Sequence, residues 1–379
     1  MSDKQSVTLV GHPFLLTGQG EHIRAAFRSM RATGIDARVL DIYGTQTVDQ
    51  DLLREIGDRR VERLDGGINV FCINGDEVDQ AFRHLNRAPD RHGYDVVYPA
   101  WELPRYPTVW AGELDRFDEV WAFSRFMLRS VEGTIKAALH HMPVASEARI
   151  VSFMGRRYFG LPESGHHFLF LFDFTSYIER KNPYAGINAF AGLLRARARA
   201  DVHFVIKVNG SRNGQDGGLD RLRETTAPYR DRITIIDKTL GENEMKNLIR
   251  CCDCFLSLHR SEGFGRGLAE AMFLGKPVIA TAYSGNMDFM TPENSFLVDY
   301  ELVPVGETAY PHGAGQVWAE PNIDQAVSYM VQLTDDPRIG QEVGRCASRA
   351  IRQHLSYRSI GLNYLARFEE IAATRGSSR

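Results

Sequence analysis

The sequence contains no hydrophobic run long enough to cross a membrane. Its longest apolar stretch, residues 168–172, falls far short of the roughly 20 residues that a bilayer-spanning helix needs. Near the N-terminus, mixed charge is followed by a short apolar stretch, residues 7–10, whereas the apolar core of a signal peptide takes about 7–15 residues. We therefore expect a cytoplasmic protein.

Neither sign of charge dominates, and cysteine is scarce. The 45 basic and 48 acidic residues leave a net charge of −3, whereas a nucleic-acid-binding domain usually carries a clear positive excess. Five cysteines, an odd number in a long chain, argue against a disulfide framework. Cys251, Cys252 and Cys254 cluster without a second Cys/His group at zinc-finger spacing, so we predict small buried side chains there.

The chain does contain a regular alternation of short apolar runs and amphipathic segments. This alternation indicates parallel sheets covered by helices, and 379 residues favour two domains because one domain usually takes about 100–200. The predicted strands are residues 7–10, 37–42, 68–73, 96–98, 119–123, 168–172, 202–206, 233–236, 254–258 and 278–280. Helices are predicted at residues 21–31, 242–250, 266–274 and 359–373, and Asn182-Pro183 has the composition of a helix start.

A Gly-, Pro- and His-rich stretch at residues 159–167 interrupts this alternation. We predict an α/β protein with two Rossmann-like, doubly wound parallel-sheet domains that face a cleft. The first spans residues 1–160, the second spans residues 166–350, and a helical segment, residues 351–379, closes the chain and packs back toward the first domain. Ligands of such folds bind outside the carboxyl ends of the strands.

The richest chemistry lies in residues 257–272, which follow a predicted strand and open a helix. Gly263, Gly265 and Gly267 let backbone N–H groups approach an anion at the positive end of that helix, so a phosphate fits there. Glu262 stands at the loop mouth, where it can accept hydrogen bonds from hydroxyls, and Glu270 lies two turns into the helix. Two alternatives remain: a Gly-rich turn with solvated glutamates, or a glycosidase-type carboxylate pair about 5–10 Å apart.

Three motifs in this half carry a resemblance to a known family. They are Glu262-Gly-Phe-Gly, Glu270-Ala-Met and Gly275-Lys-Pro-Val-Ile-Ala. Together they resemble the nucleotide-sugar signature of retaining GT-B glycosyltransferases of family 4, over roughly residues 168–298. The resemblance implies that Glu262 binds the hydroxyls of the donor sugar and Glu270 the ribose of the nucleotide. The remaining donor-binding candidates are Gly263, Phe264, Gly265, Arg266, Gly267 and His259.

The same resemblance implies a pair of cations that hold the leaving pyrophosphate. The family places an arginine and a lysine about five residues apart after the first strand of this domain, and fixed cations stabilise the charge that grows on the diphosphate. Lys181 matches the lysine, but Ser176 stands where the arginine is expected. Two residues are candidates for the missing cation: Arg180, next to Lys181, and Lys207, at the end of the next predicted strand.

In the N-terminal half the resemblance points to acceptor-side residues. Gly18 and Gly20 belong to a loop after the first predicted strand, where family members contact the donor phosphates or the acceptor; a tight turn is the alternative. Glu102 follows the strand at residues 96–98, where many members place a histidine near the acceptor hydroxyl. Glu102 is therefore a candidate for orienting that hydroxyl.

The resemblance implies a retaining, hexosyltransferase-type enzyme of the cytoplasm. It would transfer a sugar from a nucleotide diphosphate to the hydroxyl of a glycan, polysaccharide, lipid-linked or small-molecule acceptor. No cofactor or metal is implied, because no Asp-x-Asp motif comes with a ligand set and protein cations can replace Mg²⁺. Two alternatives are a nucleotide-sugar 2-epimerase of the same fold and a catalytically silent nucleotide-sugar-binding scaffold.

Three arginines recur on one face of the first predicted helix, at Arg24, Arg28 and Arg31. The usual explanation of such spacing is a solvated helix face. The alternative is a basic strip that contacts anionic lipid at the inner face of the membrane, or a lipid-phosphate-linked acceptor.

Overall fold

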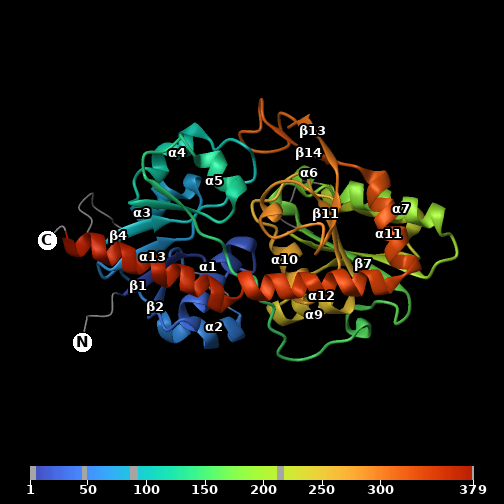
Figure 1. Cartoon of the computed structure of the whole chain (residues 1–379), viewed down its shortest axis with the longest axis horizontal. Helices are drawn as coiled ribbons and strands as arrows, with labels where there is room; N and C mark the ends of the chain where they lie inside the picture. The colour runs from blue at the N-terminus through green and yellow to red at the C-terminus, as the bar shows by residue number, and fades with distance from the viewer. Residues whose placement is uncertain (1–5, 45–48, 86–92, 211–216, 378–379) are drawn as a thin grey trace. The chain divides into compact units, whose positions relative to one another are not determined.

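The computed structural model describes residues 6–44, 49–85, 93–210 and 217–377 and divides the chain into two compact units (Figure 1). The N-terminal unit comprises Met1–Glu147 together with Gln353–Arg379, and the C-terminal unit comprises Ala148–Arg352. Each unit contains a six-stranded sheet whose strands are all parallel. The predicted α/β class with two doubly wound parallel sheets is therefore confirmed.

The N-terminal sheet has the strand order β2-β1-β3-β4-β5-β6, so the chain changes direction across the sheet between β1 and β3. Its strands are β1 (Val7–Gly11), β2 (Ala37–Asp41), β3 (Ile68–Phe71), β4 (Tyr94–Val97), β5 (Glu119–Ala122) and β6 (Ala138–His141). Its helices are α1 (Gly18–Ala32), α2 (Gln50–Ile56), α3 (Val78–His84), α4 (Thr108–Leu114), α5 (Arg125–Val131) and α13 (Tyr357–Ser377).

The C-terminal sheet has the order β12-β11-β10-β7-β8-β9, with the change of direction between β7 and β10. Its strands are β7 (His166–Asp173), β8 (Val202–Asn209), β9 (Ile233–Asp237), β10 (Cys254–Ser257), β11 (Val278–Thr281) and β12 (Phe296–Val298), followed by an antiparallel hairpin of β13 (Tyr300–Pro304) and β14 (Val317–Pro321). Its helices are α6 (Ile178–Lys181), α7 (Pro183–Ala196), α8 (Gly218–Thr226), α9 (Glu242–Cys251), α10 (Arg266–Phe273), α11 (Ile323–Asp335) and α12 (Pro337–His354).

Helices cover both faces of the C-terminal sheet, and two glycines show how closely they approach. A Cβ on Gly186 of α7 would lie 3.2 Å from Phe204 and 3.8 Å from Leu256, whereas one on Gly267 of α10 would lie 3.1 Å from Phe255. Consecutive strand residues point to opposite faces, so Phe255 and Leu256 place α10 and α7 on opposite sides. The sheet is buried on both faces, which explains why β7 is almost entirely apolar.

The boundary between the units lies at Glu147–Ala148, earlier than the predicted boundary near residue 160. Residues 151–156 belong with the C-terminal unit because side chains of α9 hold their backbone. Asn243 accepts hydrogen bonds from the amides of Val151 and Ser152, and Asn247 accepts one from the amide of Met154. These polar contacts join positions about 90 residues apart in sequence, so the loop composition alone does not reveal them.

Helix α13 returns to the N-terminal unit and packs along α1 (Figure 1). The approach is close, because a Cβ on Gly361 would lie 2.1 Å from the carbonyl oxygen of Ser29. Arg367 of α13 forms an ion pair with Glu119 of β5, a fully buried carboxylate that also accepts hydrogen bonds from Tyr94 and Trp121. These interactions keep the pKa of Glu119 below its usual value despite the opposing effect of burial.

Helix α1 begins at Gly18, three residues before its predicted start, and its arginines do not form an exposed strip. Arg24 is buried, with 3% of its surface exposed, and donates hydrogen bonds to the carbonyls of Pro13 and Leu15 and to Glu21. Arg28 is paired with Glu55 of α2, so among the three arginines only Arg31 is exposed. The exposed basic strip that was considered as a contact for anionic lipid is therefore not formed, because this face of α1 packs inside the unit.

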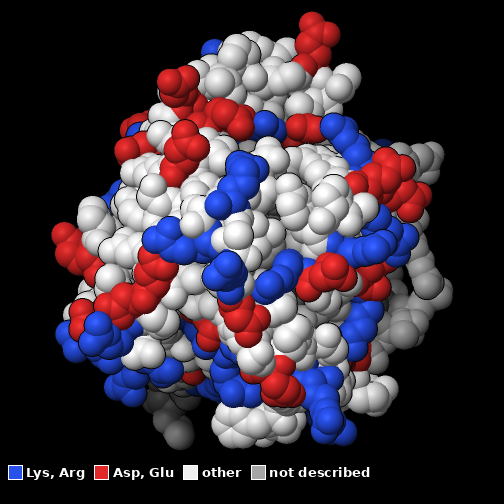
Figure 2. Space-filling view, turned by 90° about the vertical axis from the view of Figure 1, so that its right-hand side faces the viewer, with Lys and Arg blue, Asp and Glu red and all other residues white. Residues whose placement is uncertain are grey.

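The remaining surface features agree with the composition. On the face drawn in Figure 2, basic and acidic side chains are interspersed, as the near balance of charge predicts. Cys251, Cys252 and Cys254 are buried at the junction of α9 and β10, as predicted. Within the described residues, no helix combines the length and the hydropathy that crossing a bilayer requires.

The first prediction concerns the Glu119–Arg367 pair. Arg367→Met should lower the free energy of unfolding by about 3–5 kcal/mol, because it leaves the Glu119 carboxylate buried without its cation. Urea denaturation followed by tryptophan fluorescence measures this loss. The matched control is Arg358→Met, an exposed arginine on the same helix, which should change stability by no more than about 0.5 kcal/mol. Equal effects of the two variants would contradict a structural role of the pair.

Candidate functional site

The loops that follow β7 and β10 carry the principal polar cluster of the C-terminal unit. These two strands are neighbours in the sheet, but the chain leaves them in opposite directions, so their loops separate at the carboxyl edge. In doubly wound sheets ligands bind at such a switch point. Helix α6 lies in the loop after β7, and Ser261 to Gly265 follow β10.

Three charged side chains meet at this switch point. Lys181 donates a hydrogen bond of 2.5 Å to Oε1 of Glu262, and Arg180 lies 3.3 Å from Oε2 of the same carboxylate. The same Nη1 atom of Arg180 also donates to the carbonyl oxygen of Ser261 at 2.9 Å. The side chains are largely buried, with exposed fractions of 18% for Lys181, 5% for Arg180 and 13% for Glu262.

The electrostatic environment keeps Glu262 ionised. Burial alone raises the pKa of this carboxyl group, but the positive charges of Lys181 and Arg180 outweigh burial and lower the pKa to about 2. The cluster therefore combines two cations with one carboxylate and carries a net positive charge. Such a site can attract an anion while the carboxylate accepts hydrogen bonds from hydroxyl groups.

The segment after β11 holds the Glu262 loop in place. The hydroxyl oxygen of Ser284 accepts a 2.7 Å hydrogen bond from the amide of Glu262. The amide of Gly285 donates a 2.9 Å hydrogen bond to the carbonyl oxygen of Glu262. A Cβ on Gly285 would lie 1.8 Å from the carbonyl oxygen of Gly263, so only glycine fits there. The backbone of this loop is fixed before any ligand binds.

His259, which the sequence suggested as a donor-binding residue, is fully buried beneath this loop. Its Nε2 atom lies 3.2 Å from Oδ1 of Asn286 and 3.3 Å from the Tyr283 carbonyl, and Ser257 lies 3.1 Å from Nδ1. Burial lowers the pKa of His259, which keeps the ring neutral. In this structure His259 supports the loop and presents no surface to a ligand.

The Gly-rich turn that opens α10 serves two purposes. Gly265 has φ +92° and caps the helix in a left-handed conformation that favours glycine. Gly267 faces the sheet, so its missing side chain serves packing, while Arg266 is the first residue of the helix. The ring of Phe264 is buried against Phe289, with 5.1 Å between ring centroids, so the backbone of Phe264 is the part left for a ligand.

Glu270 lies on α10 and forms a buried ion pair with Lys246 of α9. Both side chains are nearly inaccessible, with exposed fractions of 8% and 4%. The sequence analysis did not identify Lys246, because the pair joins two helices and no local motif links them. Since Glu262 and Glu270 have different cationic partners, the structure gives no support to a paired-carboxylate site of the glycosidase type.

The structure separates the two candidates for the missing family cation. Arg180 reaches Glu262, whereas Lys207 donates hydrogen bonds to the carbonyl of Val208 and to Oδ1 of Asn209. Lys207 is buried, with 1% of its surface exposed, and burial lowers its pKa to about 8. Ser176 ends a short 3₁₀ turn after β7 and places no cation there.

On the N-terminal unit, the structure assigns the two candidate glycines to the first turn of α1. Thr17 caps this helix by accepting a hydrogen bond from the amide of Gly20. A Cβ on Gly20 would lie 1.9 Å from the carbonyl oxygen of Leu15, so Gly20 is required by a tight turn, whereas Gly18 has open space beside it. Glu102 is partly exposed in the loop after β4, and its acceptor role stays a prediction.

The switch point of the N-terminal sheet holds a polar cluster that the sequence analysis missed. His12 follows β1, and its Nε2 atom lies 2.9 Å from Oε1 of Glu77. Oε2 of Glu77 accepts hydrogen bonds from Gln19 at 2.6 Å and from the amide of Asn74 at 2.8 Å. These interactions lower the pKa of Glu77 against the effect of burial. A lone histidine after a strand gives no signal in the sequence, because its partner lies 65 residues away.

Among the residues that the structure describes, no group of three or more His, Cys, Asp or Glu side chains is arranged to hold a metal ion. The positive charge of the candidate site comes instead from Lys181 and Arg180.

Comparison with known proteins gives a family for part of the chain. Residues 166–306, which include all six strands of the C-terminal sheet, match the family model described as glycosyl transferases group 1. A search of curated proteins finds no match.

Solved structures show that the whole chain has a known fold. Anabaena Alr3699/HepE in complex with UDP and glucose has a TM-score of 0.66 at 14% identity, covering 98% of this chain and 100% of that one. A glycosyltransferase from Rickettsia africae ESF-5 has a TM-score of 0.70 at 14% identity, covering 98% and 99%. Sucrose-phosphate synthase (tll1590) from Thermosynechococcus elongatus has 0.66 at 13%, covering 98% and 100%.

At these identities the likeness to solved structures shows the fold, and the family model matches the C-terminal half to glycosyltransferases. The predicted GT-B architecture and the predicted glycosyltransferase domain are both confirmed. The chain thus has a GT-B fold, and its residues 166–306 match the model of glycosyl transferases group 1.

Proposed function

We propose that this protein is a retaining glycosyltransferase that moves a sugar from a nucleotide diphosphate to a hydroxyl acceptor. The observation that carries this proposal is the contact of Glu262 with Lys181 and Arg180 at the switch point of the C-terminal sheet. A carboxylate beside two cations matches a ligand that has hydroxyl groups at one end and a diphosphate at the other.

In the proposed reaction the bond between the sugar C1 and the β-phosphate oxygen breaks, and the acceptor oxygen bonds to C1 on the same face. The acceptor proton passes to the departing phosphate oxygen, so no strong protein base is needed. Lys181 and Arg180 stabilise the charge that develops on the diphosphate, and Glu262, ionised over the physiological pH range, accepts hydrogen bonds from the sugar hydroxyls.

The same cations support a reaction without a metal ion or a resident cofactor. A nucleotide diphosphate needs positive charge to leave, and Lys181 and Arg180 supply two fixed charges where the family arrangement has an arginine and a lysine. Arg180 takes the place left by Ser176, because its guanidinium reaches Glu262 while Lys207 is bound to its own strand. The amides of Gly263, Phe264 and Gly265 add hydrogen-bond donors.

We further propose that the donor is a uridine nucleotide and that Glu270 binds its ribose hydroxyls. The support for uridine is that Alr3699/HepE, which shares the fold, is known in complexes with UDP and with UDP-glucose. For Glu270, support comes from its family motif and from the buried ion pair with Lys246, which fixes the position of its side chain. Lys246 then acts as a positioning residue for the ribose contact.

Two other functions of the same fold differ in their products. A nucleotide-sugar 2-epimerase would convert the donor sugar without any acceptor, which NMR of the sugar detects. A silent scaffold would bind the donor and yield neither a transferred sugar nor an isomer. The intact cluster of Glu262, Lys181 and Arg180 favours the transferase over the scaffold.

The second prediction tests the role of Glu262. Glu262→Gln should reduce sugar transfer by at least about 100-fold, because the neutral amide loses the charged hydrogen bonds that hold the sugar. Thermal shift with UDP-, GDP-, ADP- and dTDP-sugars first identifies the donor, and a coupled assay for nucleotide diphosphate release then measures the rate. Glu293→Gln, at a fully exposed glutamate of the same unit, is the control. Full activity of Glu262→Gln in a folded protein would refute the site.

The third prediction concerns the Glu270–Lys246 pair. Glu270→Gln should weaken binding of the nucleoside diphosphate about 10-fold or more while leaving the preference among sugars unchanged, because the ribose is common to all donors. Lys246→Met should weaken binding in the same way, since it leaves Glu270 without its cation. Calorimetric titration with UDP and with UDP-sugars measures both effects, and unchanged affinity in a folded Glu270→Gln protein would count against the ribose role.

The fourth prediction tests whether Lys207 contributes to donor binding together with the donor cluster of Glu262, Lys181 and Arg180. In the folded protein the pKa of Lys207 is about 8, below its ordinary value of 10.5, so the unfolded chain binds more protons between these values and stability rises with pH across this window. Lys207→Met should stabilise the protein at pH 7 by about 1–3 kcal/mol and remove this rise. Donor affinity should not change.

Denaturation at pH 7 and at pH 10, with the half-exposed Lys238→Met as control, measures this effect. A Lys207→Met variant that loses donor binding while it remains folded would restore Lys207 as the missing cation.

A further inference from the structure

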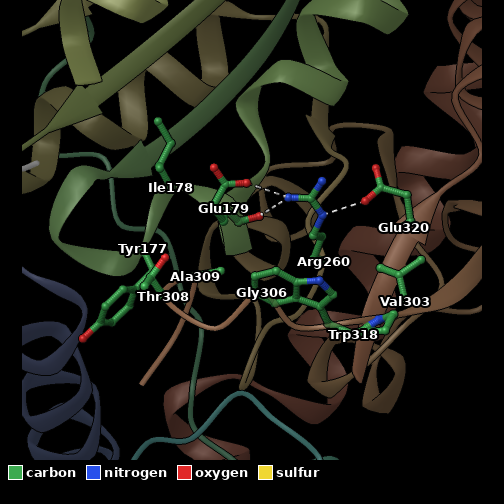
Figure 3. A pocket seen from close by; sticks show the side chains of 11 residues that line it. Tyr177, Ile178, Glu179, Arg260, Val303, Gly306, Thr308, Ala309, Trp318 and Glu320 are labelled. Atoms are coloured by element: carbon green, nitrogen blue, oxygen red, sulfur yellow. Dashed lines mark hydrogen bonds and ion pairs between the residues drawn. The ribbon is translucent and has the colours of Figure 1, made fainter. Parts of the chain in front are cut away.

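A cavity lies beside the donor cluster, which consists of Glu262, Lys181 and Arg180, within the C-terminal unit. It has a volume of about 400 Å³, which falls in the range of about 300–1,000 Å³ typical of small-ligand pockets. Figure 3 shows Arg260, one of the residues that line it, between Glu179 of α6 and Glu320 of β14. Tyr177, Thr308 and Trp318 are among the other residues that line the cavity.

The charges of this cavity favour an uncharged, hydroxyl-rich ligand. Arg260 donates to Oε2 of Glu179 at 3.1 Å and to Oε2 of Glu320 at 2.7 Å. Among the described residues, the other oxygen of each carboxylate has no hydrogen-bond partner, and the two side chains are 44% and 39% exposed. Two carboxylates around one guanidinium repel phosphates and uronates and leave acceptors for hydroxyl donors.

Residues of the cavity wall are connected to Arg180 of the donor cluster by the following contacts. The amide of Arg260 donates a 2.8 Å hydrogen bond to the carbonyl of Arg180. Tyr177, in the cavity wall, packs against Tyr310 at 4.8 Å between ring centroids, and the guanidinium of Arg180 lies 6.0 Å from the centre of the Tyr310 ring. A ligand in the cavity therefore contacts the residues that position Arg180.

Four of the eleven residues that line the cavity lie outside the part of the chain that matches the family model. That match ends at residue 306, whereas Thr308, Ala309, Trp318 and Glu320 come from the rest of the β13–β14 hairpin. Family-wide donor chemistry explains Glu262 and Glu270, but it does not explain this hairpin. Part of the cavity wall is therefore formed by residues that the family match does not include.

We propose that this cavity is a binding subsite for a neutral sugar unit of the acceptor. The carboxylates of Glu179 and Glu320 accept hydrogen bonds from its hydroxyls, and Tyr177 supplies an apolar surface for the ring. That the bound sugar belongs to the acceptor rests on the proposed glycosyltransferase function. Binding of a sugar to the cavity is testable without any transfer activity.

The experiment uses saturation-transfer difference NMR on the full chain with methyl α-D-glucopyranoside, and with D-glucuronate as its anionic counterpart. The expected result is binding of the neutral glycoside and at least about fivefold weaker binding of glucuronate. Glu179→Gln with Glu320→Gln, and separately Ala309→Phe, which fills the cavity without touching its charges, should each weaken glycoside binding at least about fivefold. Glu293→Gln should leave it unchanged.

Glu262→Gln, run in parallel, assigns the signal to one of the two sites. Binding that survives in Glu262→Gln and is lost in Ala309→Phe supports the cavity. Binding lost in Glu262→Gln but kept in Ala309→Phe places the glycoside at the donor cluster and overturns the proposal, as does the absence of any binding or a preference for glucuronate. A separate titration with UDP tests the proposed function, so the two failures are distinguishable.

Discussion

The arrangement of the donor site depends on one contact, the Glu262 carboxylate held between Lys181 and Arg180. It joins the loops after β7 and β10, which leave adjacent strands in opposite directions. Two like charges next to each other on a four-residue helix would repel, and the carboxylate offsets this repulsion while it stays ionised. In the proposed function the same charges bind the diphosphate and the sugar hydroxyls, so the carboxylate that stabilises the two cations also binds the donor sugar.

The sequence predicted the parts of the site that depend on local geometry. Glu262 and Lys181 each follow a strand end closely, and parallel strands bring their carboxyl ends to one edge, so their meeting follows from the fold. Lys246 beside Glu270 and His12 beside Glu77 could not be predicted, because each pair joins segments that no periodic pattern relates. Side-chain periodicity identifies which face of an element is apolar, but it does not identify the element that packs there.

The arginines of α1 illustrate the same limit. Spacing of i, i+4 and i+7 predicts one helix face, and that much is correct, but it does not distinguish a face in water from a face inside the unit. Arg28 lies near Tyr357 of α13, which is 329 positions away in sequence, and Arg24 closes the loop before its own helix. In a chain so rich in arginine, several guanidinium groups serve as internal hydrogen-bond donors. The number of arginines therefore does not indicate whether the protein binds an anionic partner.

The departure at Ser176 and the hairpin after β12 are linked by Arg180. In the proposed function Arg180 replaces the family arginine from a different position in the loop, so its guanidinium needs contacts that hold it there. The buried ring of Tyr310, which belongs to the hairpin, lies 6.0 Å from this guanidinium. The hairpin also forms one wall of the cavity around Arg260. If Arg180 stabilises the leaving group and the cavity binds the acceptor, as proposed, the hairpin couples occupancy of the cavity to the position of Arg180 and thereby favours transfer to the correct acceptor.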